Sequence, residues 1–195
     1  MANNFFAMHS RMKYINRWAL MRNTASENIS QHSNDVAAVA HALAVMKNIR
    51  FGGKLNADRA AFLGLYHHMP EIITGDMPTP VKYHSKEMRD EFLKVEEMAC
   101  ERLLSMLPDD MREYYESAFF PEEEDEYLWK IVKAADKISA LIKCIEEKNA
   151  GNREFEKAYQ STEKAIKEMG LPEADAFLEE FIPAFHLSLD EQNSR

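Results

Sequence analysis

The chain has 195 residues, of which 46% are hydrophobic and 29% are charged, and its formal net charge is −9 at pH 7. This composition is typical of a globular protein and predicts a single domain over residues 1–195. The negative charge argues against binding to a nucleic-acid polymer, which normally needs a dense basic surface, but leaves small phosphate esters open as ligands.

Cysteine usage and hydropathy predict where the protein acts. Cys100 and Cys144 belong to no CxxC pair and are expected to be free thiols, which suits a reducing cytoplasm. The N-terminus lacks the long apolar core and the small-residue cleavage site of a signal peptide. No run of 18 apolar residues predicts a membrane span. We therefore expect a cytoplasmic protein that does not bind membranes.

Apolar residues at intervals of three and four predict helices in the first third of the chain. The first such stripe covers residues 5–15. A second helix is expected to begin at Ser30, whose hydroxyl can cap free amides, and to end at Gly52. A third is expected to follow Asn56 as its N-cap and to stop before Pro70, which cannot donate a backbone hydrogen bond.

The rest of the chain shows the same periodicity, interrupted by a proline-rich loop over residues 74–80. The expected elements are a long helix from Ser85 to Pro108, a short helical turn over 111–118, a helix from the acidic run 122–126 to 149–151, and two helices over 153–168 and 173–182. No alternating strand pattern exceeds four residues. The sequence therefore predicts an all-α fold, a compact bundle of six or seven helices.

Side chains suited to metal binding or proton transfer fall on separate predicted helices: His32, His67, His68, Glu71 and Asp136. Asp136 carries the most weight because it lies in the most apolar helix, where an ionised carboxylate is costly unless it is paired or bound to a metal. Helical bundles build metal sites from inward-facing side chains of different helices. Imidazole and carboxylate suit one divalent transition metal such as Mn, Co, Ni, Zn or Fe.

The residues alone also allow simpler roles in ion pairing or helix capping. Asp136 can pair with Lys133 or Lys137, and His32 can cap its helix or contact Asp35 one turn later. If His32 binds a metal, Asp35 is the expected acceptor for its other ring nitrogen. Glu71 can be an ordinary acidic residue at a helix N-terminus.

Several stretches together resemble a known family. They are residues 15–18 (INRW), 27–33 (ENISQHS), 65–68 (LYHH) with Glu71, 74–82 (TGDMPTPVK), 133–137 (KAADK) and 181–190 (FIPAFHLSLD). In these stretches the chain is similar to the bacterial 5'-deoxynucleotidases of the HD-domain phosphohydrolase superfamily. The resemblance implies a helical bundle of the HD-domain type, usually a homodimer, that removes phosphate from deoxyribonucleoside 5'-monophosphates with one divalent metal.

The resemblance also implies the metal ligands, which fall on His32, His67, the position of His68, and Asp136. The family is named for a His-Asp pair, whereas here His67 is followed by His68. The replacement removes one negative charge and an acceptor that can orient a nucleophilic water. His68 can still ligate, which gives a donor set that zinc accepts. Alternatively the metal binds weakly and hydrolysis is impaired, and both readings stay open here.

The same resemblance assigns the substrate side of the site. Glu71 is implied as the general acid and base, Arg17 as the phosphate-binding residue, and Trp18 as the side chain that packs on the sugar and helps to exclude a 2'-hydroxyl. Asp76 is implied to contact the substrate in the catalytic site. Arg17 and Trp18 can also form a structural cation–π pair, and Asp76 can simply make a turn. The expected activity is a metal-dependent 5'-deoxynucleotidase. The alternatives are a nucleotide-binding protein that has lost hydrolysis through His68, and an HD hydrolase of another nucleotide or phosphodiester.

Overall fold

The computed structural model describes residues 3–82 and 84–194, and within these ranges it contains helices and turns with no strand beyond one isolated bridge. The α-helices are α1 (Phe5–His9), α2 (Ile29–Arg50), α3 (Ala57–Tyr66), α4 (Glu71–Thr74), α5 (Thr79–Lys82), α6 (Lys86–Leu104), α7 (Asp109–Glu116), α8 (Glu126–Asn149), α9 (Glu156–Glu168), α10 (Pro172–Glu180) and α11 (Leu189–Gln192). Short 3₁₀ turns lie at Ser10–Tyr14, Glu123–Asp125, Arg153–Phe155 and Ile182–His186. The all-α prediction is confirmed. Among the described helices, none has the length and hydropathy to cross a bilayer.

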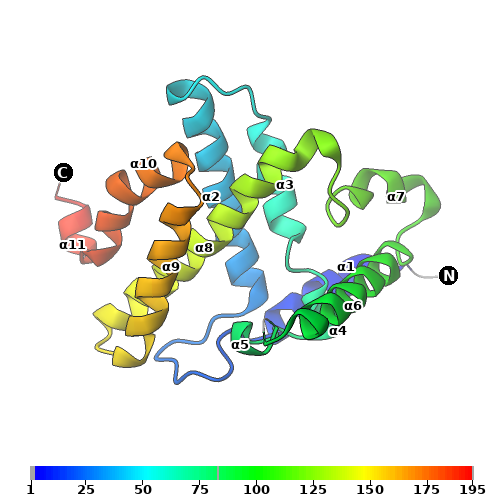
Figure 1. The fold of residues 1–195 in the computed structure, drawn as a ribbon, viewed down its shortest axis with the longest axis horizontal. Coiled ribbons are helices and arrows are strands. Elements are labelled where there is room, and N and C mark those ends of the chain that lie inside the picture. The colour runs from blue at the N-terminus through cyan, green and yellow to red at the C-terminus, as the bar shows by residue number, and fades with distance from the viewer. Residues whose placement is uncertain (1–2, 83, 195) are drawn as a thin grey trace.

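Helices α2, α3 and α8 form the centre of the molecule (Figure 1). The C-terminal helices α9, α10 and α11 lie on one side of it, and α1, α4, α5 and α6 are grouped on the other. The apolar stripe of α8 provides several fully buried side chains, among them Ile131, Ile138 and Ile145. They pack with Val36 and Leu43 of α2 in one core cluster. Burial of this stripe fixes the rotation of α8, and with it the direction of the polar residues that interrupt the stripe.

A close approach of α2 and α3 holds two predicted site regions together. A Cβ atom built on Gly64 of α3 would lie 2.9 Å from the Cα atom of Ala37 in α2. Only glycine permits this contact without a shift of one helix. The C-terminal end of α3, where His67 follows, therefore lies against the first turns of α2.

Several helix boundaries differ from the predictions. The N-cap of α2 is Asn28 rather than Ser30, because the Asn28 amide oxygen accepts hydrogen bonds from the backbone of Ser30 and Gln31, both at 3.0 Å. The caps at Asn56 and Ser85 are confirmed. The predicted stripe over 5–15 is divided into α1 and a 3₁₀ turn, and the predicted loop over 74–80 contains the start of α5.

Candidate functional site

His32 lies in the first turn of α2 and is fully buried. Its Nε2 atom is 2.8 Å from Oδ1 of Asp136, and its Nδ1 atom is 3.0 Å from the Ser139 hydroxyl and 2.9 Å from Nη1 of Arg17. Burial, reinforced by the Arg17 charge, lowers the pKa of His32 to about 3. The ring is therefore neutral at pH 7, which is the form that can bind a metal.

The contacts of His32 correct one expectation. Asp35, predicted as the acceptor for its second ring nitrogen, is exposed on α2. Ser139 of α8 and Arg17 of the preceding loop take that place instead. The spacing within α2 could not reveal these contacts, because both come from other elements.

Asp136 projects from the middle of α8 toward two histidines. Its Oδ1 atom lies 2.8 Å from Nε2 of His32 and 3.3 Å from Nε2 of His68. Burial would raise the pKa of the Asp136 carboxyl, but the two imidazoles outweigh it and hold the pKa well below the usual value. Asp136 is thus a carboxylate whose neighbours are imidazoles, and its side chain keeps 30% exposure to solvent.

His68 contacts both Asp136 and Glu71. Its Nδ1 atom is 2.9 Å from Oε1 of Glu71, at the start of α4, and its ring centroid is 4.6 Å from that of His32. The turn after α3 brings Glu71 back over His68, since the Glu71 amide donates to the His68 carbonyl oxygen at 3.1 Å. Burial lowers the pKa of His68, yet the carboxylates of Asp136 and Glu71 outweigh it and raise the pKa to about 9.

The donor atoms of His32, His68 and Asp136 all lie within 4.8 Å of one another. Beside this cluster, the buried Glu71 Oε2 atom has no hydrogen-bond partner among the described residues, and His68 Nε2 has only its 3.3 Å approach to Asp136 Oδ1, which does not satisfy hydrogen-bond geometry. Unpaired buried polar atoms are rare in folded proteins, and a bound ion is one of the groups that satisfies them. Two imidazole nitrogens and one carboxylate are donors that a borderline divalent ion accepts. The residues present therefore fit a transition-metal site.

His67 lies beside this cluster and outside the group of donors within 4.8 Å. Its ring centroid is 4.6 Å from that of His68 and 5.7 Å from that of Trp129 in α8. Burial, followed by the charge of His68, lowers the pKa of His67 to about 3. The structure thus brings together three of the four predicted ligands and places the fourth next to them, packed against an aromatic ring.

Arg17 and Trp18 enter the site from the loop between the first 3₁₀ turn and α2. Glu27 accepts hydrogen bonds from Nη1 of Arg17 at 2.7 Å and from Nε1 of Trp18 at 2.8 Å. The guanidinium lies 5.5 Å from the Trp18 ring centroid, so the simpler cation–π pairing is also present. Because Arg17 contacts His32 as well, this loop is joined directly to the histidine and aspartate cluster.

Asp76 follows α4, and its carboxyl is influenced by the same charged residues. Burial, followed by the Glu71 charge, raises the pKa of Asp76, while Arg17, His68 and the backbone of Trp18 lower it. Asp76 is therefore near Glu71 and the Arg17 loop. The arrangement as a whole offers a cation-binding cluster flanked by one guanidinium and two further carboxyls, which is suited to a small phosphate ester.

Sequence reasoning assigned no role to two residues of this site, Ser139 and Glu27. Glu27 was within a stretch recognised by resemblance, but no role was assigned to it, because its contacts with Arg17 and Trp18 depend on the path of a loop.

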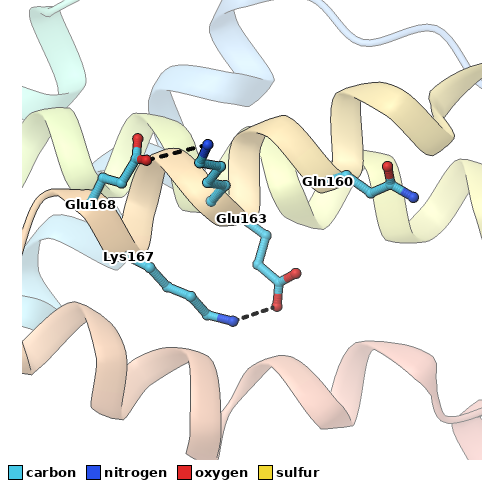
Figure 2. Close-up of a pocket in the computed structure, with 5 residues that line it drawn as sticks. Gln160, Glu163, Lys167 and Glu168 are labelled. Carbon is cyan, nitrogen blue, oxygen red and sulfur yellow. Dashed lines mark hydrogen bonds and ion pairs between the residues drawn. The ribbon is translucent and has the colours of Figure 1, made fainter.

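A separate surface pocket is lined by Gln160, Glu163, Lys164, Lys167 and Glu168, all on α9 (Figure 2). Its lysines pair with its glutamates, and no predicted site residue lines it.

Comparisons with known proteins agree with this geometry. A family model described as 5'-deoxynucleotidase YfbR-like matches residues 4–185. The chain is 49% identical to a 5'-deoxynucleotidase of Vibrio vulnificus over 97% of each chain. It is 48% identical to the 5'-deoxynucleotidase YfbR of Salmonella newport, over 97% of this chain and 95% of that protein. Among solved structures, an HD-domain phosphohydrolase from Listeria innocua aligns with a TM-score of 0.81 and 24% identity, over 93% of this chain and 88% of that one. This last likeness supports the fold.

Proposed function

This chain belongs to the 5'-deoxynucleotidase YfbR-like family, and we propose that it hydrolyses deoxyribonucleoside 5'-monophosphates to a deoxynucleoside and phosphate. The observation that carries the proposal is the cluster of His32, His68 and Asp136, with Arg17 and Glu71 bonded to its members. A small site of this kind suits a mononucleotide, whose phosphate needs only one or two local positive charges.

We propose that His32, His68 and Asp136 hold one divalent transition metal, with His67 as the fourth ligand. Co, Mn, Zn, Ni and Fe are the candidate ions, since this donor set suits them all. When bound, such an ion lowers the pKa of a water molecule and polarises a phosphoryl oxygen. The neutral state of His32 and the ionised state of Asp136 support this assignment, because metal ligands must be deprotonated.

We propose that other residues of the protein bind the substrate and transfer the proton. Arg17 neutralises the phosphate charge, and Trp18 packs on the sugar and disfavours a 2'-hydroxyl. Glu71 accepts the proton of the attacking water and delivers it to the 5'-oxygen of the leaving deoxynucleoside. Asp76 contacts the substrate within the same catalytic site. Glu71 bonds to His68, Arg17 contacts His32, and the charges of both act on the Asp76 carboxyl, which supports these roles.

The hydrogen bond between His68 and Glu71 favours a second candidate, a nucleotide-binding protein with lost or impaired hydrolysis. With its pKa raised to about 9, His68 is an imidazolium at neutral pH in the absence of metal. An imidazolium repels a cation, and its hydrogen bond occupies one oxygen of Glu71. The two candidates share the binding residues and differ in turnover.

Phosphate release from a panel of deoxyribonucleoside and ribonucleoside monophosphates tests the proposal. The protein is first loaded separately with Co²⁺, Mn²⁺, Zn²⁺, Ni²⁺ or Fe²⁺. We expect release from the deoxyribonucleotides and much less from the ribonucleotides. Binding by calorimetry without release would select the second candidate. Release only from a phosphodiester or from another nucleotide would reassign the substrate. Absence of both binding and release would refute the proposal.

We further propose that the protein is a cytoplasmic homodimer. Exposed apolar side chains at Met88, Val95 and Met98 lie on one side of α6, at spacings of seven and three residues, and suit a self-association surface. The free, buried thiols of Cys100 and Cys144 suit a reducing compartment. Sedimentation of the protein with Met98→Glu, expected to be more monomeric than wild type, checks the dimer.

A further inference from the structure

We infer that Glu27 is a positioning residue that holds the phosphate-binding and sugar-binding side chains as one unit, an inference that rests on the proposed function. A single oxygen, Oε2 of Glu27, accepts both the Arg17 guanidinium at 2.7 Å and the Trp18 indole N–H at 2.8 Å. The side chains of Arg17 and Glu27 are only 12% and 11% exposed. Charged hydrogen bonds shielded from water are among the stronger polar contacts in proteins.

The backbone places Glu27 opposite Arg17 independently of the intervening residues. The Arg17 amide donates to the Glu27 carbonyl oxygen at 2.9 Å, the Ile29 amide donates to the Ile15 carbonyl oxygen at 2.9 Å, and Asn16 pairs with Asn28 in an antiparallel bridge. This short ladder fixes the two Cβ atoms across from each other. The Glu27 carboxylate is therefore held within reach of the Arg17 guanidinium.

Trp18 needs an external contact to keep its conformation. It is the one non-glycine residue with a positive φ, +60°, in the described part of the chain. This left-handed backbone is unfavourable for a residue with a side chain, so contacts made by that side chain must maintain it. Glu27 supplies the hydrogen bond to the indole, and the Phe155 ring, at a centroid distance of 5.3 Å, supplies packing.

Glu27 also links this pair to the metal-binding cluster. Its Oε1 atom is 3.8 Å from Nδ1 of His32, and Arg17 contacts the same ring nitrogen. We therefore expect the carboxylate to set the phosphate and sugar contacts relative to the cluster through Arg17 and Trp18, without itself touching the substrate. Its loss should affect how a nucleotide is held more than how quickly a held nucleotide reacts.

The fold of the loop does not depend on Glu27 alone. Its far end is fixed by the buried Glu147 of α8, which accepts the amides of Thr24 and Ala25, while Lys143 donates to the Ala25 carbonyl oxygen. A change at Glu27 should thus leave the loop folded and release only the side chains that it orients. This separates a positioning role from a general role in stability.

Glu27→Gln is the direct test because the amide keeps an acceptor oxygen but removes the negative charge that strengthens the hydrogen bonds from both donors. We expect KM for a deoxyribonucleoside monophosphate to rise about tenfold, as for the loss of one charged hydrogen bond, with a much smaller change in kcat and a reduced preference for deoxyribose. Glu27→Asp, which keeps the charge, should recover part of the affinity. Glu154→Gln is the matched control, because Glu154 pairs with the exposed Arg22 of the same loop.

Tryptophan fluorescence gives a readout that does not require activity. The chain has two tryptophans, so Trp129→Phe leaves Trp18 as the only tryptophan, whose emission is excited selectively at wavelengths that tyrosine does not absorb. In that background Glu27→Gln should increase quenching of Trp18 by acrylamide, and Glu154→Gln should not. Unchanged quenching in a folded Glu27→Gln protein, together with unchanged nucleotide affinity by calorimetry, would overturn the inference.

If wild type binds deoxyribonucleotides without releasing phosphate, hydrolysis fails as the proposed function, while quenching and affinity still decide the role of Glu27. Should Glu27→Gln not fold, the same comparison is made with Glu27→Asp, for which a smaller shift in both readouts is expected and no shift refutes the inference.

Discussion

His68 Nδ1 lies 2.9 Å from Oε1 of Glu71, so the imidazole at the position of the family's aspartate is bonded to the proposed proton-transfer residue. In the family's pattern this position is an aspartate, which would repel Glu71 and attract a metal. Here the side chain attracts Glu71 and, when protonated, opposes a metal. The pair is therefore a point at which this chain departs from the family's His-Asp pattern.

Replacement of His68 by Asp should reverse this relationship. The substitution His68→Asp adds a negative charge beside Asp136 and frees Glu71, so metal affinity and kcat should each rise, by about tenfold or more. Metal competition assays and phosphate release measure the two effects. His41→Asp, an exposed histidine on α2, is the control for added charge. Lower activity in His68→Asp would instead show that this chain has adapted to its imidazole.

The stability of the metal-free protein should be greatest near pH 6.5. The pKa values of His32 and His67 are lowered to about 3, so below pH 6.5 the unfolded chain binds more protons and stability falls as pH decreases. The pKa of His68 is raised to about 9, so between pH 6.5 and 9 the folded chain holds the extra proton and stability falls as pH increases.

Thermal unfolding from pH 4 to 9.5 in the presence of a chelator checks this profile. His68→Gln should abolish the alkaline decrease and keep the acid one. His41→Gln should leave the whole profile unchanged, because that ring is 46% exposed. A flat wild-type profile between pH 6.5 and 9 would contradict the raised pKa of His68.

Gly64→Ala should destabilise the protein and weaken the metal site together. The new Cβ would lie 2.9 Å from the Cα atom of Ala37, so α2 and α3 must separate, at a cost of about 1–3 kcal/mol. The separation moves His68 away from His32. Chemical denaturation and metal titration measure the two effects, with the exposed Asp58→Ala on α3 as the control. A change in stability with unaltered metal affinity would mean that the helix ends adjust independently.

Glu147→Gln should lower stability by about 3 kcal/mol, because it leaves Lys143 as a buried charge without its partner. Both side chains are almost fully buried, and Glu147 also accepts two amides of the loop that carries Arg17 and Trp18. Urea denaturation gives the free energy, and limited proteolysis should show faster cleavage within residues 19–26. Glu146→Gln, next to it and exposed, should change neither.

The sequence predicted the helical core well, because α2, α3, α6 and α8 carry apolar stripes and recognisable caps or breakers. It also predicted that His32, His68 and Asp136 would be close together, since the family resemblance aligned each of them. It failed where contacts cross a loop. The partner of His32 proved to be Ser139 and Arg17 rather than Asp35, and the role of Glu27 was not predicted. The contacts of Arg17 and Glu27 depend on the backbone ladder at Asn16 and Asn28, for which a residue pattern gives no signal, and the contact with Ser139 depends on how α8 packs against α2.

Helix α8 carries Asp136 in its middle and Glu147 eleven residues later, about 16 Å along its axis. One rigid rod thus fixes both the cation-binding carboxylate and the far anchor of the nucleotide-binding loop. Inserting or deleting a single residue between them would rotate one end by about 100° relative to the other. Point substitutions in this part of α8 can therefore change the activity while keeping both ends in register. Insertions or deletions between Asp136 and Glu147 should abolish function.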